Sequence, residues 1–467
     1  MRGPSRARLA AAHVLERVET KGAFAPIALT SAIQSHDLAP MDRNLATEIV
    51  YGVLRWRGRL DFYLSRFSKR RIGSLSPWVR NAMRIGAFHV LFHDSVPIPV
   101  ALSESVELAK VKERYAAGYV NAVLRAFVRG RASVRFPDPD KDIAAYLETW
   151  ESHPRWLVER WLAAWGNEGA RSLCATNNAP ADITLRVNVA KTSVEDVRAG
   201  LLSVGIEPSM GRLTPHALRV RAAGSVEGLP GFEQGLFHIQ DEGSQLVGWA
   251  VAPDGRGPIA DVCAGPGGKT THLAELWHVR SGRTEPPASA PIVAFDLHDH
   301  RTALITSSAA RLGLDRLIRV HTADARAISP DVYGTFSRVL VDAPCTGTGV
   351  LRRRPDLRWQ KSPEDVAALV QTQREILTGA ERLVAKGGTL VYSTCSLEPE
   401  ENIENARWFL ARFPEFRPES MADDLPSLAN LARDRFALDG AALQLAPHLD
   451  GTDGMFIFRA IRREVGK

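Results

Sequence analysis

Two cysteines each follow an apolar run that has the character of a β-strand. Cys345 ends the stretch Val339–Cys345, which reads Val-Leu-Val-Asp-Ala-Pro-Cys, and Cys395 stands in Thr389–Ser396, which reads Thr-Leu-Val-Tyr-Ser-Thr-Cys-Ser. In an open α/β sheet, ligands bind outside the carboxyl ends of the strands. Two cysteines at strand ends can therefore meet at one site, where one thiolate attacks a substrate and the other assists its release.

The composition is typical of a globular protein in a reducing compartment. The chain has 467 residues, of which 45% are hydrophobic and 24% are charged, and this length predicts two or three domains. Its four cysteines have no regular spacing, so we expect neither a disulfide framework nor a metal site. A cytoplasmic location fits this cysteine usage best. The cysteines are Cys174, Cys263, Cys345 and Cys395.

The N-terminal residues lack the pattern of a signal peptide. The basic stretch Met1–Arg8 is followed by Glu16, Arg17 and Glu19, which interrupt the apolar core that a signal peptide needs. No uncharged apolar run is long enough to span a bilayer. We therefore expect no membrane partner.

Charge is distributed unevenly along the chain. Residues 1–135 contain 22 Lys and Arg but 10 Asp and Glu, whereas the remaining residues contain 37 Lys and Arg and 43 Asp and Glu. Positive charge concentrated in one segment indicates binding to a polyanion, although a solvated basic surface would give the same counts.

The pattern of apolar residues divides the chain into three parts. Up to about residue 135, apolar positions recur at helical spacing, and the proline-rich stretch Phe136–Asp140 is typical of a linker. Residues 141–235 combine a helical stripe with short alternating runs such as Ile183–Val187, which indicates a small α+β domain. From about residue 240, strands and helices alternate, which predicts a doubly wound, mostly parallel sheet. Its predicted strands are Ile259–Cys263, Ile292–Asp296, Leu317–Val320, Val339–Asp342, Thr389–Ser393 and Met455–Ile461.

One helix of this last part has a clear start signal. The stretch Ser362–Asp365 reads Ser-Pro-Glu-Asp and supplies an N-cap, a proline for the first turn and two acids that suit the positive end of the helix dipole. An apolar stripe continues to Val384, and we expect the pair Gly387–Gly388 to end the helix.

A glycine-rich loop follows the first predicted strand. The segment Asp261–Thr270 reads Asp-Val-Cys-Ala-Gly-Pro-Gly-Gly-Lys-Thr and opens a helix, where glycines permit close approach of a ligand and free N–H groups are available. The run Gly268–Thr270 invites comparison with a Walker A loop, but that motif requires glycine at the position of Cys263. No complete dinucleotide-binding G-x-G-x-x-G is present. By itself, the loop is as typical of a structural turn as of a cofactor site.

Two aspartates end the next two strands. Asp296 is placed where a carboxylate can accept hydrogen bonds from both hydroxyls of a ribose, and Asp324 could reach an adenine amino group. A glycine loop and two acids, without a lysine for phosphate, describe a pocket for a nucleoside. S-adenosylmethionine therefore fits better than NAD or ATP. Each aspartate alone could instead be a helix cap.

Together these motifs resemble those of the RNA cytosine-C5 methyltransferases, a family that uses two cysteines. The segment Cys263–Lys269 is similar to the cofactor loop of that family, with Gly265 in place of the usual alanine. Asp342–Gly349 and Ser393–Ser396 are similar to its two catalytic motifs. Further segments that resemble the family are Gln240–Asp241, Arg352–Trp359 and His448–Gly454.

The resemblance covers nearly the whole chain and is close to the bacterial 16S rRNA methyltransferases of the Fmu/Sun type. It implies an all-α NusB-like RNA-binding domain at residues 1–138, a small α+β, RRM-like domain at 139–235 and a Rossmann-like S-adenosylmethionine-dependent methyltransferase domain at 236–467. The likeness is weakest at 141–235 and at Val279–Pro291, which looks like an insertion between cofactor motifs.

The resemblance also implies which residues bind S-adenosylmethionine. They are Cys263, Ala264, Gly265, Pro266, Gly267, Gly268, Lys269, Asp296, Asp324 and Asp342. Lys269 could contact the target base or the carboxylate of the cofactor. The thiols of Cys263 and Cys174 are expected to be packing groups.

In this family the chemistry is covalent. Cytosine C5 is a poor nucleophile, and adding a thiolate to C6 makes C5 able to accept a methyl group. By resemblance, Cys395 is the nucleophile and Cys345 serves the release step, in which the C5 proton leaves and Cys395 is expelled. Asp342 is expected at the N3 and amino edge of the cytosine, where it would have to be protonated to donate a hydrogen bond. A buried packing role is the alternative for Cys345.

The implied partner is RNA, namely 16S rRNA as a free or partly assembled small subunit, and not DNA, and the protein is expected to be a monomer. The target base must be unpaired or flipped to reach the pocket. The basic N-terminal segment would hold the RNA backbone. Arginines just after Cys345 could clamp phosphates near the target, or form a solvated loop. They are Arg352, Arg353, Arg354 and Arg358.

Three other functions remain open from the sequence. The enzyme could act on a cytosine of tRNA, since the NusB-like segment favours rRNA only by analogy. The protein could be a non-catalytic RNA-binding or antitermination factor, although the intact cysteine motifs argue against this. A nucleotide hydrolase that uses Gly268–Thr270 as a phosphate loop would have to bind ATP.

Overall fold

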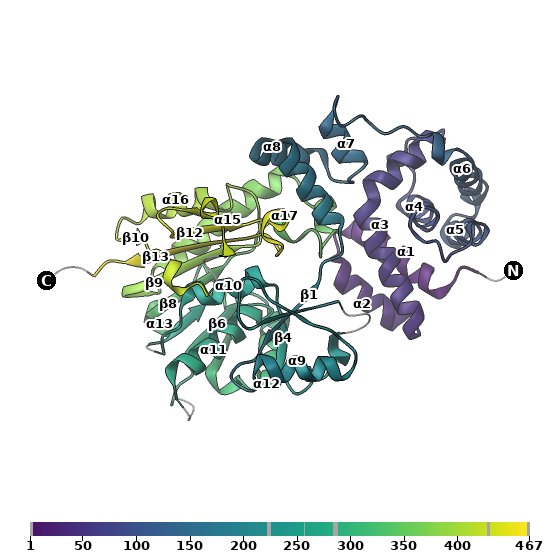
Figure 1. Cartoon of the computed structure of the whole chain (residues 1–467). Coiled ribbons are helices and arrows are strands. Elements are labelled where there is room, and N and C mark those ends of the chain that lie inside the picture. Colours follow the sequence, from purple (N-terminus) through teal and green to yellow (C-terminus); the bar gives the residue numbers. More distant parts are fainter. Residues whose placement is uncertain (1–2, 222–225, 256, 284–287, 427–429, 465–467) are drawn as a thin grey trace. The chain divides into compact units, whose positions relative to one another are not determined.

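The computed structural model describes residues 3–221, 226–255, 257–283, 288–426 and 430–464 (Figure 1). The chain forms two compact units. The first contains residues 1–179 together with 351–362, and the second contains 180–350 and 363–467. The division into domains after residues 138 and 235 remains a prediction.

The first unit is built from helices, as the apolar spacing predicts. Small residues on one face of the first helix, among them Ala7, Ala10 and Ala11, are fully buried and permit close packing against its neighbours. The fourth helix begins where the Ser76 hydroxyl accepts a hydrogen bond from the backbone N–H of Val79. The helices are α1 (Arg6–Lys21), α2 (Ala25–Ser35), α3 (Pro40–Phe67), α4 (Pro77–Phe92), α5 (Ile98–Lys112), α6 (Ala117–Gly130), α7 (Ile143–Thr149), α8 (Arg155–Asn178) and α14 (Leu357–Gln360).

Several arginines of this unit are structural rather than free for a polyanion. The Glu19 carboxylate accepts hydrogen bonds from Arg57, Arg80 and Arg84 at 3.3, 2.8 and 3.2 Å. Burial alone would raise the pKa of Glu19, but these guanidinium groups outweigh it and lower the pKa. Arg59 lies over the ring of Trp150, 3.8 Å from its centroid. Only part of the positive charge counted in residues 1–135 is therefore available to bind a polyanion.

The second unit contains a small antiparallel sheet. Its described strands have the order β2–β3–β1–β4, and α9 (Val194–Ser203) packs on it through Val197 and Leu201. The Ser193 hydroxyl caps α9 by accepting a hydrogen bond from the N–H of Asp196, as the sequence predicts. The strands are β1 (Ile183–Val187), β2 (Ser209–Met210), β3 (Ala217–Val220) and β4 (Phe237–Ile239).

The second unit also contains a large mixed sheet. Within the described residues its strands have the order β11–β12–β13–β9–β8–β5–β6–β7, and β10 pairs with β13. The pairs from β9 to β7 are parallel, and those involving β10 to β13 are antiparallel. The strands are β5 (Ile259–Asp261), β6 (Ile292–Asp296), β7 (Ile318–Thr322), β8 (Phe336–Asp342), β9 (Val384–Thr394), β10 (Phe416–Pro418), β11 (Phe436–Ala437), β12 (Ala442–Leu445) and β13 (Met455–Arg462).

Helices cover both faces of this sheet. One apolar cluster joins α10, α11 and α12 to strand residues such as Leu340, and the other joins α15 and α16 to the alternate residues Val339 and Val341. This is the predicted doubly wound α/β fold. The remaining helices are α10 (Glu242–Val251), α11 (Gly268–Ser281), α12 (Asp299–Leu312), α13 (Pro330–Tyr333), α15 (Pro363–Glu381), α16 (Ile403–Arg412) and α17 (Pro447–Asp450).

One predicted boundary is wrong. Helix α15 begins at Pro363 as expected but ends at Glu381, and the pair Gly387–Gly388 lies inside β9. A Cβ atom on Gly388 would lie 3.0 Å from the carbonyl oxygen of Ser337 on the neighbouring strand. These glycines lie where the register between β8 and β9 shifts, after the pair Phe336–Val384 and before the pair Arg338–Thr389, so they permit a bulge in β9 rather than end a helix.

None of the helices in the described ranges combines the length and apolar character needed to cross a lipid bilayer.

Candidate active site

The two cysteines predicted to share a site do so. Strands β8 and β9 pair in parallel, with Asp342 opposite Ser393, so the turns that follow them leave the sheet at the same edge. The Sγ atoms of Cys345 and Cys395 lie 3.3 Å apart, and both residues are partly buried.

The two thiols are not equivalent. The hydrogen bond to Cys395, followed by burial, raises the pKa of Cys345 well above its usual range. Cys345 therefore keeps its proton and can donate it in the hydrogen bond to the Cys395 sulfur. Of the two sulfur atoms, that of Cys345 is therefore the one held as a thiol.

Asp342 forms an ion pair beside the cysteines. Its Oδ2 atom lies 2.7 Å from Nζ of Lys269, and its Oδ1 atom accepts a hydrogen bond of 2.7 Å from the Ser393 hydroxyl. Burial alone would lower the pKa of Lys269, but the Asp342 carboxylate outweighs it and raises the pKa. Both Asp342 oxygens thus act as hydrogen-bond acceptors here, one from the Lys269 ammonium and one from the Ser393 hydroxyl, and Lys269 is the donor of the ion pair.

The glycines let the loop pack closely against Asp296 and α12. A Cβ atom on Gly265 would lie 2.5 Å from Oδ2 of Asp296, and Gly267 has φ +108° immediately before α11. The first backbone N–H groups of α11 follow this loop directly, and such groups at the start of a helix have no acceptor within the helix itself. Lys269, which a phosphate-binding loop would direct at a nucleotide, is instead paired with Asp342. The loop therefore fits a cofactor without phosphate better than ATP.

The two predicted nucleoside-binding acids have different surroundings. The carboxylate of Asp296 accepts hydrogen bonds from the backbone N–H groups of Gly265 and His298 at 2.9 and 3.0 Å. These bonds fix its orientation and leave lone pairs for further donors. Asp324 is held by Arg326, whose Nε and Nη2 lie 2.9 and 2.6 Å from its two oxygens, and this hydrogen bonding lowers the pKa of Asp324. Its predicted contact with an adenine would have to share the carboxylate with Arg326.

Comparisons with known proteins identify the family of this chain. A family model described as "16S rRNA methyltransferase RsmB/F" matches residues 249–460, a NusB family model matches 5–129, and a model of the ferredoxin-like domain of RsmF/B-like methyltransferases matches 153–227. The probable ribosomal RNA small subunit methyltransferase B of Bacillus subtilis (strain 168) is 37% identical over 450 residues, 96% of each chain. The chain belongs to the RsmB/F methyltransferase family. The predicted family resemblance and the NusB-like character of the N-terminal helices are confirmed.

Two further relatives extend this result. A second RsmB/F relative, the probable ribosomal RNA small subunit methyltransferase B of Synechocystis (strain PCC 6803), is 33% identical over 455 residues, which are 97% of this chain and 98% of that protein. The solved structure titled "Crystal Structure of PH0851" is 28% identical, with a TM-score of 0.79 over 98% of this chain and 99% of that chain. The predicted fold class is confirmed for this RsmB/F methyltransferase.

A buried arginine of the small sheet was not predicted to contribute to the site of this RsmB/F methyltransferase. Arg186 of β1 is fully buried, and its Nη1 atom donates to the carbonyl oxygen of Gly268 at 2.6 Å. Its Nε and Nη2 atoms lie 3.0 and 2.7 Å from the Glu275 carboxylate, and Nη2 also donates to the Thr271 hydroxyl at 3.0 Å. The small sheet thus anchors the first turns of α11. The alternation of β1 gave no signal for this role, because Leu185 and Val187 face the core of the small sheet and Arg186 falls on the opposite face.

The acid that begins the loop was also not predicted to have a role of its own. Asp261 ends β5 and is fully buried, and its Oδ2 atom accepts a hydrogen bond of 2.7 Å from the Thr270 hydroxyl. Burial raises the pKa of Asp261 to about 7. The thiol of Cys263 is also shielded, and burial raises its pKa well above the usual range, consistent with a packing role. Cys174 is fully buried within the first unit and behaves in the same way.

The phosphate clamp predicted for the arginines after Cys345 is wrong for Arg358. This segment belongs to the first unit, where Arg358 is fully buried and its Nη1 atom donates to the carbonyl oxygens of Arg55 and Ser152 at 3.0 and 3.1 Å. Burial lowers the pKa of Arg358 to about 9. Trp359 beside it donates from Nε1 to the carbonyl oxygen of Leu54 at 2.6 Å. The segment is part of the core of the helical unit and not a solvated basic loop.

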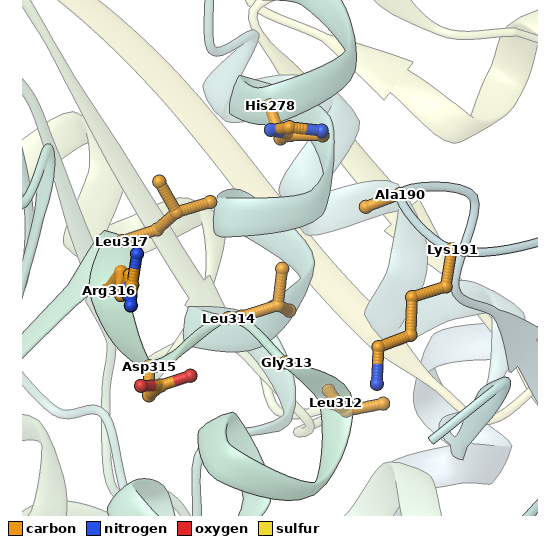
Figure 2. Close-up of a pocket in the computed structure, with 9 residues that line it drawn as sticks. All are labelled: Ala190, Lys191, His278, Leu312, Gly313, Leu314, Asp315, Arg316 and Leu317. Atoms are coloured by element: carbon orange, nitrogen blue, oxygen red, sulfur yellow. The ribbon is translucent and has the colours of Figure 1, made fainter. Parts of the chain in front are cut away.

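A hollow of about 290 Å³ in the second unit does not belong to the cofactor loop (Figure 2). His278, near the C-terminal end of α11, lines this hollow. The cofactor loop lies at the N-terminal end of the same helix, roughly 15 Å away at 1.5 Å per residue. The Lys191 amine at its edge lies 3.2 and 3.3 Å from the carbonyl oxygens of Gln234 and Arg311. Lys191 therefore caps the end of α12 and is not directed at a ligand.

Proposed function

We propose that this methyltransferase transfers a methyl group from S-adenosylmethionine to C5 of one cytosine in small-subunit rRNA, through a covalent bond between Cys395 and C6. The observation that carries the proposal is the pair of cysteine sulfur atoms 3.3 Å apart at the ends of two parallel strands. The names of the full-length relatives, which are small-subunit rRNA methyltransferases, support the choice of RNA.

The cofactor would be held at the glycine loop. When bound, S-adenosylmethionine supplies an electrophilic methyl group on a sulfonium. The residues that fit it are the loop Cys263–Lys269, whose glycines let it pack directly against Asp296, and Asp296 itself, whose fixed carboxylate can accept hydroxyl hydrogens. Asp324 and Asp342 complete the proposed set of cofactor-binding residues. Asp324 would accept hydrogen bonds from the cofactor through the oxygen lone pairs that Arg326 does not use.

Attack would begin at Cys395. Its sulfur forms a bond to cytosine C6 while the C5–C6 electron pair moves into the ring toward N3 and the carbonyl oxygen. The Lys269 ammonium, held by Asp342, can donate a hydrogen bond or a proton to the ring as negative charge develops there.

Release would use Cys345. In the adduct the Cys395 sulfur is a thioether, which accepts hydrogen bonds poorly, so the contact that holds the Cys345 proton in the free enzyme is lost. Cys345 can then give its proton to water and take the proton from C5. The electrons of the C5–H bond restore the C5–C6 double bond, the bond between C6 and sulfur breaks, and Cys395 leaves as a thiolate.

RNA would be held in part by exposed basic residues of the first unit. Near the end of α3 and beyond it, exposed basic side chains gather where Phe67 of α3 contacts Phe127 of α6. These residues, defined here as the basic patch, are Arg66, Lys69, Arg70, Arg71, Arg125 and Arg129. They can contact phosphates while an unpaired or flipped cytosine enters the catalytic pocket. We also propose the domain limits 1–138, 139–235 and 236–467.

Substitution of each cysteine tests the mechanism. With labelled cofactor and total RNA from cells that lack the gene, Cys395→Ala should abolish methyl transfer, and Cys345→Ala should accumulate a covalent RNA–protein adduct. Bisulfite sequencing of RNA from cells with and without the gene identifies the methylated cytosine. Undiminished transfer by Cys395→Ala would overturn the nucleophile assignment. A methylated cytosine in tRNA, and none in 16S rRNA, would overturn the proposed substrate.

A further inference from the structure

A buried carboxylate lies behind both cysteine turns. Glu401 is fully buried in the loop after β9. Its Oε1 atom accepts a hydrogen bond of 2.9 Å from the backbone N–H of Thr346, and its Oε2 atom accepts hydrogen bonds of 2.5 Å from the hydroxyls of Thr346 and Ser396. Thr346 directly follows Cys345, and Ser396 directly follows Cys395. One side chain thus contacts the neighbours of both catalytic cysteines.

The same carboxylate is tied to a third element. The Gln373 side chain of α15 donates from Nε2 to Oε1 of Glu401 and to the carbonyl oxygen of Pro344, both at 2.9 Å. Pro344 directly precedes Cys345, so the turn that carries this cysteine is held on both sides. Asn405 orients Gln373 by donating to its Oε1 atom at 2.8 Å. The turn is therefore fixed by buried polar groups that hydrogen-bond to one another at short distance.

We propose that Glu401 is a positioning residue that sets the distance between the two cysteine sulfurs by accepting hydrogen bonds from both turns. Four donors converge on it, and each is neutral, namely one backbone N–H, two hydroxyls and one amide. An ionised carboxylate accepts all four without a competing donor, whereas an amide could accept only at one of its two ends. The site thus selects Glu rather than Gln at position 401.

This role rests on the proposed two-cysteine mechanism. Attack by Cys395 needs only its own turn, but release needs Cys345 at a set distance from the adduct. Loss of Glu401 should therefore slow release more than attack, because reacting groups that shift by about 1 Å lose roughly 100-fold in rate. An excess of the covalent adduct is the signature that a general loss of stability would not produce.

The test compares full-length Glu401→Gln, Thr346→Val and the double variant in the rate at which methylated RNA is released from the enzyme, with total RNA from cells that lack the gene as the substrate. Each single variant should lose roughly 10- to 100-fold in rate, with S-adenosylhomocysteine affinity within about twofold of the wild type. The double variant should be no slower than the slower single variant, because both substitutions break the same interaction. Denaturing gels should show more covalent RNA adduct in Glu401→Gln than in the wild type.

Matched controls separate the outcomes. Glu404→Gln changes an exposed glutamate three residues further along and should leave the rate unchanged. Thr346→Ser keeps the hydroxyl and should retain the rate that Thr346→Val loses, which tests the hydrogen bond even if Glu401→Gln does not fold. A full rate in both Glu401→Gln and Thr346→Val, while Cys395→Ala is inactive, overturns the positioning role alone. Transfer by Cys395→Ala instead overturns the covalent mechanism on which it rests.

Discussion

The Nζ atom of Lys269 lies 2.7 Å from Oδ2 of Asp342, joining the first turn of α11 to the end of β8. The cofactor loop and the turn that carries Cys345 are thus connected by one ion pair. In the proposed mechanism, this pair delivers a positive N–H donor to the site where negative charge develops. A fixed donor in a water-poor site stabilises such charge more than water does.

Lys269→Met should therefore impair chemistry more than cofactor binding. We expect methyl transfer to fall by at least about 100-fold, as for loss of one electrostatic donor, while the S-adenosylhomocysteine dissociation constant measured by calorimetry changes little. Lys269→Arg keeps a positive donor and should retain more activity than Lys269→Met. A large loss of affinity with normal turnover at saturating cofactor would instead place the lysine on the cofactor carboxylate.

Arg186→Met should weaken cofactor binding from outside the catalytic pocket. The variant removes the donor to the Gly268 carbonyl and leaves Glu275 buried without its partner, which typically costs about 3–5 kcal/mol of stability. The double variant Arg186→Met/Glu275→Leu should recover most of this stability in thermal unfolding. It should not recover S-adenosylhomocysteine affinity, because Gly268 still lacks its donor. Normal affinity in the folded double variant would contradict the anchoring role.

The pKa of Asp261 predicts a specific dependence of stability on pH. An unfolded aspartate titrates near 4, whereas burial raises the pKa of Asp261 to about 7 in the folded chain. Between these values the folded state binds more protons than the unfolded state. The stabilising contribution of Asp261 to the free energy of unfolding is therefore fully present below pH ~4. It is lost as the pH rises to ~7, and the free energy of unfolding falls by up to ~1.4 kcal/mol per pH unit.

Asp261→Asn should remove this slope. The free energy of unfolding of both proteins is measured with urea and without cofactor. As the pH rises from 5 to about 7, the value for the variant should rise relative to that for the wild type, and the difference should stay constant above that pH. Taking the difference cancels the other titrating groups. A difference that does not change with pH would contradict the raised pKa.

The basic patch should control RNA affinity without affecting the cofactor site. Replacing Arg66, Lys69, Arg70 and Arg71 together by Gln should weaken RNA binding and reduce the slope of log affinity against log salt by roughly 0.7 to 0.9 for each phosphate that the protein no longer neutralises. Filter binding at several salt concentrations measures both effects. Arg417→Gln, an exposed arginine of β10, is the control. An unchanged salt slope would exclude the patch from RNA binding.

The sequence alone determined the chemistry-bearing residues and the class of fold. The motifs that contain Cys345, Cys395 and the glycine loop each follow a strand directly, and parallel strands bring their carboxyl ends to one edge. Local order along the chain was therefore enough to place these groups together. The alternation of apolar runs likewise fixed most strand positions, but it could not show that Gly387–Gly388 belongs to a strand, since a glycine pair is equally typical of a helix end.

The tertiary structure decided the partners of the buried polar groups. Lys269 pairs with an aspartate 73 positions away, and Arg186 with a glutamate 89 positions away. Arg358, which looked like a phosphate ligand, is buried among carbonyl oxygens of the helical unit. A charged side chain has the same appearance in a sequence whether it faces water or an interior acceptor. Only packing decides which, because burial of a charge is tolerated only where the fold supplies partners for it.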